Sequence, residues 1–242
     1  MSEPHYFGTG ELSEFLRMPP WERAVPRTVV LPGLRPPAPP ALHWTDGEQA
    51  RWERAWMHDD EEPGDGWQAE IDRVFAAREA HGEQVPWLLA AAPFELVEPY
   101  GHVLNSIDFG GRGLSTLRRV LARFGDKAVT VMVRAAQRDP DNASVLLPVD
   151  GTAATFVMAR LLRGYRTQRD GLAWFARHIG TAAPDLVAAA VDAPQRQRTL
   201  AWTTLDTLSR VGHREAIHCT AAEFGADVLA AVETRLRPRQ SA

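Results

Sequence analysis

Residues 114–126 read LSTLRRVLARFGD, and this stretch shows how the fold is built. Its apolar side chains recur every three or four positions, which places them on one face of an α-helix. A glycine after such a segment is a common helix end, and an aspartate is a preferred cap for the next helix. We therefore predict that two helices meet at Gly125, with a buried stripe formed by Leu114, Leu117, Val120, Leu121 and Phe124.

The same pattern occurs a second time, because Glu223-Phe224-Gly225-Ala226-Asp227 repeats the sequence of helix, glycine and helix near the C-terminus. A helix that ends in Phe-Gly and restarts at once forms a tight antiparallel pair, and such pairs bury both faces by stacking. We predict an all-α, HEAT-like helical-repeat solenoid over residues 67–242, with about ten helices of ordinary length. An irregular helical array would show the same periodicity.

Further apolar stripes and capping residues extend this prediction over the rest of the chain. The stripes are Trp67, Ile71, Val74 and Phe75, followed later by Leu200, Leu205, Leu208 and Val211. The expected helix ends are Gly82, Gly125, Gly164, Gly180, Gly212 and Gly225, the expected N-caps are Ser115, Asp126 and Thr181, and Pro184 and Pro194 stand at early helical positions.

Residues 1–66 form an N-terminal arm in this prediction. Eight prolines between residues 19 and 40 fix φ and remove backbone donors, which favours extended chain. Thr45 and Glu48 have capping-box spacing and predict a helix over 46–57, whereas the acidic residues that follow predict a solvated loop. We expect four tryptophans to staple the arm to the helices rather than to form an exposed patch: Trp21, Trp44, Trp52 and Trp56.

Composition limits the classes of function. The 242 residues carry a formal charge of −4 and a single cysteine, Cys219, so we expect a reducing cytoplasmic setting and little general attraction for nucleic acid. No apolar stretch approaches the roughly 20 residues of a membrane span, and no secretory signal is apparent. Of the 27 basic residues only Lys127 is a lysine, which fits a GC-rich coding genome.

Several segments, in order along the chain, resemble the helical-repeat region of large bacterial MolR-like proteins. They are Met18-Pro19-Pro20-Trp21, LHWTDGE at 42–48, RDGLAWFARH at 169–178, residues 200–211, Gly212-His213-Arg214 and AAEFG at 221–225. The resemblance implies an all-helical scaffold associated with regulatory or conflict-related gene products, with no established reaction and no catalytic residue. The WGR domain and the C-terminal domain that often accompany this region have no counterpart here.

The one locally basic stretch is the strongest candidate for a binding surface. Arg163, Tyr165, Arg166, Arg169 and Arg177 cluster around a predicted helix turn. They predict a patch for a protein partner or, against the adverse net charge, for nucleic acid. Arginines that simply coat the solvent face of two helices would give the same pattern.

Three other groups carry weaker predictions. Gly111, Arg112, Gly113 and Ser115 open a helix and suggest an anion site, although the loop lacks the lysine of a P-loop. His213, His218 and Cys219 have poor spacing for a metal or a thiol site, and the acidic run 59–62 lacks the fixed ligand positions of a calcium loop. We therefore expect no cofactor, no metal and no catalysis, and predict a non-enzymatic interaction scaffold with nucleic-acid binding as the alternative.

Overall fold

A computed structural model describes residues 38–55, 66–76, 84–109 and 113–236. The α-helices of this part are α2 (Glu48–Glu53), α3 (Trp67–Ala76), α4 (Gln84–Ala91), α5 (Phe94–Val97), α6 (Leu114–Phe124), α7 (Asp126–Arg138), α8 (Thr152–Leu161), α9 (Gln168–Asp192), α10 (Gln195–Leu208), α11 (Arg214–Glu223) and α12 (Ala226–Arg235). Two 3₁₀ segments, η2 (Glu98–Ser106) and η3 (Pro140–Leu146), and a π segment, η4 (Ser209–His213), join them, and the strands are β1 (Ala41–Leu42) and β2 (Val149–Asp150). The all-α prediction is confirmed.

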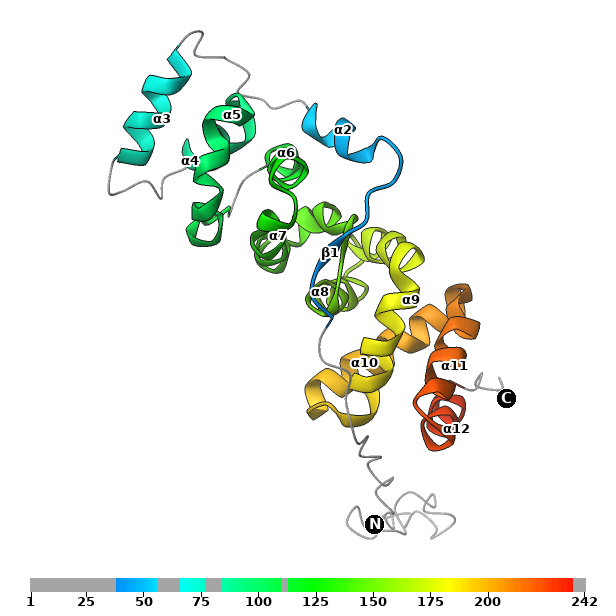
Figure 1. Ribbon diagram of the computed structural model, residues 1–242. Helices are drawn as coiled ribbons and strands as arrows, with labels where there is room; N and C mark the ends of the chain where they lie inside the picture. The colour runs from blue at the N-terminus through cyan, green and yellow to red at the C-terminus, as the bar shows by residue number, and fades with distance from the viewer. Residues whose placement is uncertain (1–37, 56–65, 77–83, 110–112, 237–242) are drawn as a thin grey trace, which may run out of the picture.

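The helices form an elongated row, in which α6 to α10 pack on their neighbours in the chain, whereas α2 and α4 both pack mainly on α6 (Figure 1). α6 packs on α7, α7 on α8, α8 on α9 and α9 on α10, while α11 contacts both α9 and α12. The predicted stripe of α6 is buried, since Leu117, Val120 and Leu121 are fully enclosed. Among the described residues, no helix is long and apolar enough to cross a membrane.

The predicted helix ends are only partly correct. Gly125, Gly164, Gly212 and Gly225 do separate helices, and Gly125 has a φ of 56°, which an L-residue rarely adopts. Gly180, however, does not end a helix but lies inside α9. The kink in α9 falls two residues earlier, at His178, whose φ and ψ are −118° and 16°. Gly82 lies outside the described residues.

The three predicted N-caps, Ser115, Asp126 and Thr181, are wrong, because each lies inside a helix and not before its first residue. Gly113 and Gly125 precede α6 and α7, so Ser115 and Asp126 lie within the first turns instead of capping them. Thr181 is inside α9 and donates a hydrogen bond from its hydroxyl to Asp150.

Val211 does not belong to the buried stripe predicted with Leu200, Leu205 and Leu208. It is exposed because it follows α10, in the π segment where Gly212 has a φ of 106°.

The N-terminal arm, here residues 38–55, crosses the middle of the row (Figure 1). β1 pairs antiparallel with β2, Ala41 opposite Asp150 and Leu42 opposite Val149. The arm runs so close that a Cβ at Gly151 would lie 3.0 Å from the Cα of Pro40, which requires glycine there. The sequence did not predict this strand pair.

The arm ends in α2, which is shorter than the predicted helix over 46–57 because Gly47 adopts a left-handed conformation before it and the chain leaves the helix at Arg54. α2 packs on α6. Trp44 and Trp52 meet edge to face at 5.2 Å, and the guanidinium of Arg118 lies 5.1 Å from the Trp52 ring. The expected stapling is confirmed for these two tryptophans, whereas Trp21 and Trp56 lie outside the described residues.

Candidate interaction groove

An open groove of about 670 Å³ lies where α7, η3, α8 and the turn before α9 meet, and we call it the α7–α8 groove. Its volume is within the range of about 300 to 1,000 Å³ that is usual for ligand sites. Its lining is largely apolar, with arginines and one aspartate among the rest: Ala136, Gln137, Pro140, Asp141, Val157, Arg160, Leu161, Gly164, Tyr165, Arg166 and Thr167.

The turn between α8 and α9 has a fixed shape. At the end of α8, the carbonyl oxygen of Leu161 accepts from the hydroxyl of Thr167 at 2.7 Å and from the amide of Gly164 at 3.1 Å. The chain is so tight that a Cβ at Gly164 would lie 2.7 Å from the Thr167 hydroxyl oxygen. Tyr165, at the tip of this turn, is 97% exposed. A large aromatic ring is therefore held in solvent at the rim of the groove.

Four exposed arginines surround this tip: Arg160, Arg163, Arg166 and Arg169. Arg166 contacts Asp141 across the groove at 3.3 Å, but both side chains are largely exposed, at 81% and 63%, so this ion pair contributes little to stability. Arg160, Arg163 and Arg169 form no ion pair with another described residue. The rim of the groove thus has an excess of positive charge.

Arg177 does not belong to this surface, and grouping it with the exposed arginines is corrected here. One of its terminal nitrogens donates to both carboxylate oxygens of Glu48, at 3.2 and 2.9 Å. The two side chains are only 19% and 9% exposed. Because Glu48 lies in the arm, 129 residues earlier, nothing in the local sequence around Arg177 indicates this partner.

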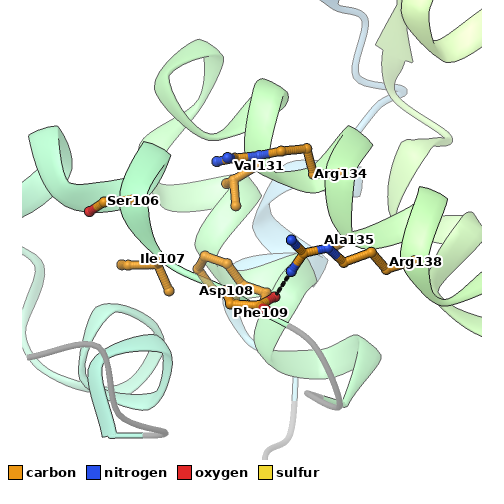
Figure 2. A pocket seen from close by; sticks show the side chains of 8 residues that line it. All are labelled: Ser106, Ile107, Asp108, Phe109, Val131, Arg134, Ala135 and Arg138. Carbon is orange, nitrogen blue, oxygen red and sulfur yellow. Dashed lines mark ion pairs between the residues drawn. The ribbon is translucent and has the colours of Figure 1, made fainter.

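The predicted anion loop is described only in part. Gly111 and Arg112 lie outside the described residues, Gly113 precedes α6 in an extended conformation, and Ser115 is the second residue of that helix. A small pocket of about 90 Å³ adjoins the loop, lined by α7 and by the residues up to Phe109 (Figure 2). Figure 2 shows the Asp108–Arg138 ion pair at its edge, and Arg134 donates to the carbonyl of Asn105 at 2.6 Å. The pocket has room for a few water molecules only, and both cations already have acceptors.

A buried carboxylate and two histidines join the arm to the row of helices. One oxygen of Asp150 accepts from the Thr181 hydroxyl at 2.8 Å and from the amide of Gly151 at 2.6 Å. The other faces Nε2 of His43 at 3.5 Å and Nδ1 of His178 at 4.0 Å. Nε2 of His178 lies 2.8 Å from the Leu147 carbonyl, which makes that nitrogen the donor in the neutral ring.

The cluster links the arm and β2 to α9. Burial lowers the pKa of His178 below its usual value, more than the Leu147 carbonyl and Asp150 raise it. Within the described part of the chain, no group of three or more His, Cys, Asp or Glu side chains is arranged to hold a metal ion. Sequence reasoning missed these residues because His43 and Asp150 are brought together only by the pairing of β1 with β2.

The other weak candidates lie apart from the groove. Cys219 is exposed on α11, and Nδ1 of the neighbouring His218 lies 4.0 Å from Glu233 of α12. The acidic run 59–62 lies outside the described residues.

No family model, no curated protein and no solved structure matches the chain.

Proposed function

We propose that the protein is a non-enzymatic, cytoplasmic scaffold of the MolR-like type that binds a protein partner in the α7–α8 groove. One observation carries the proposal: an apolar groove opens to solvent directly beside Tyr165, which is 97% exposed. Exposed aromatic and arginine side chains over an apolar pocket are typical of the residues that contribute most to protein–protein binding.

The rigidity of the turn supports this proposal. Thr167 and Gly164 fix the backbone of the turn that carries Tyr165 and Arg166 before any partner arrives. A surface that is already ordered loses less conformational entropy on binding, so more of the contact energy appears as affinity. The neighbour-to-neighbour packing of α6 to α10 also supports a HEAT-like repeat scaffold, an architecture whose stacked units form an extended surface for partners.

Selection from a library of random peptides displayed on phage tests this function. Gln137 is exposed and lines the groove, so Gln137→Trp would fill the groove without disturbing the core. Gln197→Trp makes the same change on an exposed position of α10 and serves as the control. We expect peptides that bind the wild type and Gln197→Trp but not Gln137→Trp. Absence of enriched peptides, or equal binding to all three proteins, would contradict the proposal.

Nucleic-acid binding is the second candidate, because four exposed arginines surround an exposed tyrosine. Single-stranded nucleic acids combine such charges with an aromatic ring on which a base stacks. Fluorescence anisotropy with labelled dT and U oligomers would then show salt-dependent binding that falls on Arg166→Glu and Arg169→Glu. Retention of neither oligomer at low salt would remove this candidate.

A further inference from the structure

We propose that the α7–α8 groove takes an acidic peptide segment that carries one large apolar side chain as an anchor. This inference rests on the proposed function and specifies the chemistry of the partner. It combines two features of the groove, its apolar walls and its positively charged rim, which one ligand must satisfy together.

The walls determine the anchor. Ala136 of α7, Val157 and Leu161 of α8 and Pro140 of η3 form the apolar lining. The first three are at most 8% exposed, so the exposed Pro140, together with Tyr165 at the rim, offers most of the accessible apolar surface. These residues come from three different elements that are packed on the core, so the shape of the groove does not depend on the ligand. The space holds a leucine- or phenylalanine-sized side chain together with part of the peptide backbone. Burial of such a side chain would remove its apolar area from water.

The rim determines the charge of the flanking residues. Arg160 and Arg166 line the groove, and Arg163 and Arg169 lie on the same turn and on the first turn of α9. Asp141 is the only acidic residue in the lining. Within the lining itself, two arginines thus outnumber one carboxylate, although the whole chain has a formal charge of −4. Planar guanidinium groups bind carboxylates with paired hydrogen bonds, so glutamate and aspartate are the side chains that this rim recognises.

The Arg166–Asp141 contact shows where the first carboxylate would bind. Asp141 already holds the Arg166 guanidinium over the groove at 3.3 Å. A carboxylate of the ligand would meet an arginine that is oriented toward the opening. Because Asp141 is largely exposed, it can turn into solvent without leaving a buried charge behind.

The same features favour a peptide over a nucleic acid. A sugar-phosphate backbone would contact the arginines of the rim but has no apolar side chain to enter the groove beside Pro140. A peptide uses the walls and the rim together. In an extended peptide, successive residues are about 3.3 Å apart and point to opposite sides, so an anchor that enters the groove places its neighbours toward the rim.

The composition of the selected peptides tests this inference separately from the proposed function. Peptides of twelve random residues are selected on the wild type, counter-selected on Gln137→Trp and sequenced. We expect an excess of Asp and Glu around one Leu, Phe or Trp. Groove-dependent peptides without an acidic excess would overturn the acidic chemistry and leave the proposed function standing. Absence of any groove-dependent peptide would overturn the proposed function itself.

Fluorescence anisotropy then measures the contribution of charge. The most enriched acidic peptide is compared with its Asn/Gln counterpart on the wild type, on Arg163→Glu/Arg166→Glu and on the control Arg196→Glu, which changes an exposed arginine of α10. We expect the acidic peptide to bind about tenfold more tightly than its neutral counterpart at low salt, and to lose that advantage in the double variant only. An unchanged ratio would overturn the inference.

Two other occupants would give distinct results. A labelled dT oligomer that binds the wild type more tightly than any acidic peptide, and is lost in the double variant, would replace the peptide by a nucleic acid. The chain carries its own acidic run at residues 59–62. Sedimentation that shows self-association of the wild type but not of Gln137→Trp would identify a second copy as the occupant, and would overturn a separate acidic partner.

Discussion

Two groups of arginines in this protein have opposite environments. Arg118, Arg123 and Arg177 are largely buried and contact a tryptophan ring, backbone carbonyls and a carboxylate respectively. Arg160, Arg163, Arg166 and Arg169 are exposed around one turn, and only Arg166 has an acidic partner. The first group fastens elements that are distant in sequence, whereas the second leaves its hydrogen-bonding capacity open to a ligand. What an arginine does here depends on the acceptors that the fold brings to it.

Glu48 illustrates the first group. Burial alone would raise the pKa of its carboxyl, but the hydrogen bonds from the Thr45 amide and from Arg177 outweigh burial and hold the pKa below its usual value. A carboxyl with a lowered pKa in the folded state stabilises the protein above its unfolded pKa, and this stability is lost as the pH falls through the folded pKa. Neutral pH therefore leaves the Glu48–Arg177 pair intact.

The largest effect should come from removing one member of that pair. Arg177→Met leaves the carboxylate of Glu48 almost buried without its cation, and we expect a loss of about 3 kcal/mol in the free energy of unfolding. Urea denaturation at neutral pH measures it. Glu48→Gln combined with Arg177→Met should recover part of the loss, because no charge then stays unpaired. If Arg177→Met cost no more than Arg166→Met, the contrast between buried and exposed arginines would fail.

Arg123 should give the next largest effect. Its guanidinium donates to the carbonyls of Leu89, Ala90 and Ala92 at the end of α4. Burial lowers the pKa of Arg123 to about 10, so the group stays protonated at neutral pH. Arg123→Met leaves these carbonyls without a donor, and we expect a loss of about 2 kcal/mol. Hydrogen exchange should accelerate at the end of α4 in this variant but not in Arg169→Met.

A pH series gives a smaller and separable effect at His178. Because burial lowers its folded pKa, the unfolded chain binds a proton more readily below the usual value of 6.5, so stability is complete above that pH and falls as the pH drops below it. The loss is at most about 1.4 kcal/mol per pH unit. His178→Gln keeps a donor for the Leu147 carbonyl and should flatten the dependence below about pH 6.5. Parallel curves for the two proteins would contradict this assignment.

The smallest change in stability is expected at the groove. Arg166→Met removes an exposed contact with Asp141 and should alter the free energy of unfolding by less than about 0.5 kcal/mol. Thermal denaturation with and without a selected peptide would separate the two roles of this residue. The variant should melt like the wild type when alone and gain less from the peptide.

The helical class and the exposed turn could be predicted because their signals are local. The stripe from Leu117 to Phe124 is a spacing along one helix, and the excess of arginine around Tyr165 is a property of a few consecutive residues. Helix ends were less predictable. At Gly125 one glycine both ends α6 and precedes α7, which left no capping role for Asp126.

The contacts of the arm could not be predicted, since each of them joins residues that are distant in sequence. Leu42 reads as an isolated apolar residue until Val149 pairs with it. Thr181 has the residue type of a helix cap, but its hydroxyl bonds the carboxylate of Asp150 instead. The groove could not be predicted either, because its lining combines residues of α7, η3, α8 and the following turn.

The arm contacts residues that are far along the chain, and this affects the order in which the protein folds. Pairs of neighbouring helices form contacts that are close in sequence and can assemble early, whereas Glu48 must wait for Arg177, 129 residues later. At a synthesis rate of roughly 5 to 20 residues per second, this delay is on the order of ten seconds. Until α6 has been synthesised, Trp44 and Trp52 lack the helix on which α2 packs, and the arm can complete its contacts only once Arg177 of α9 has been made.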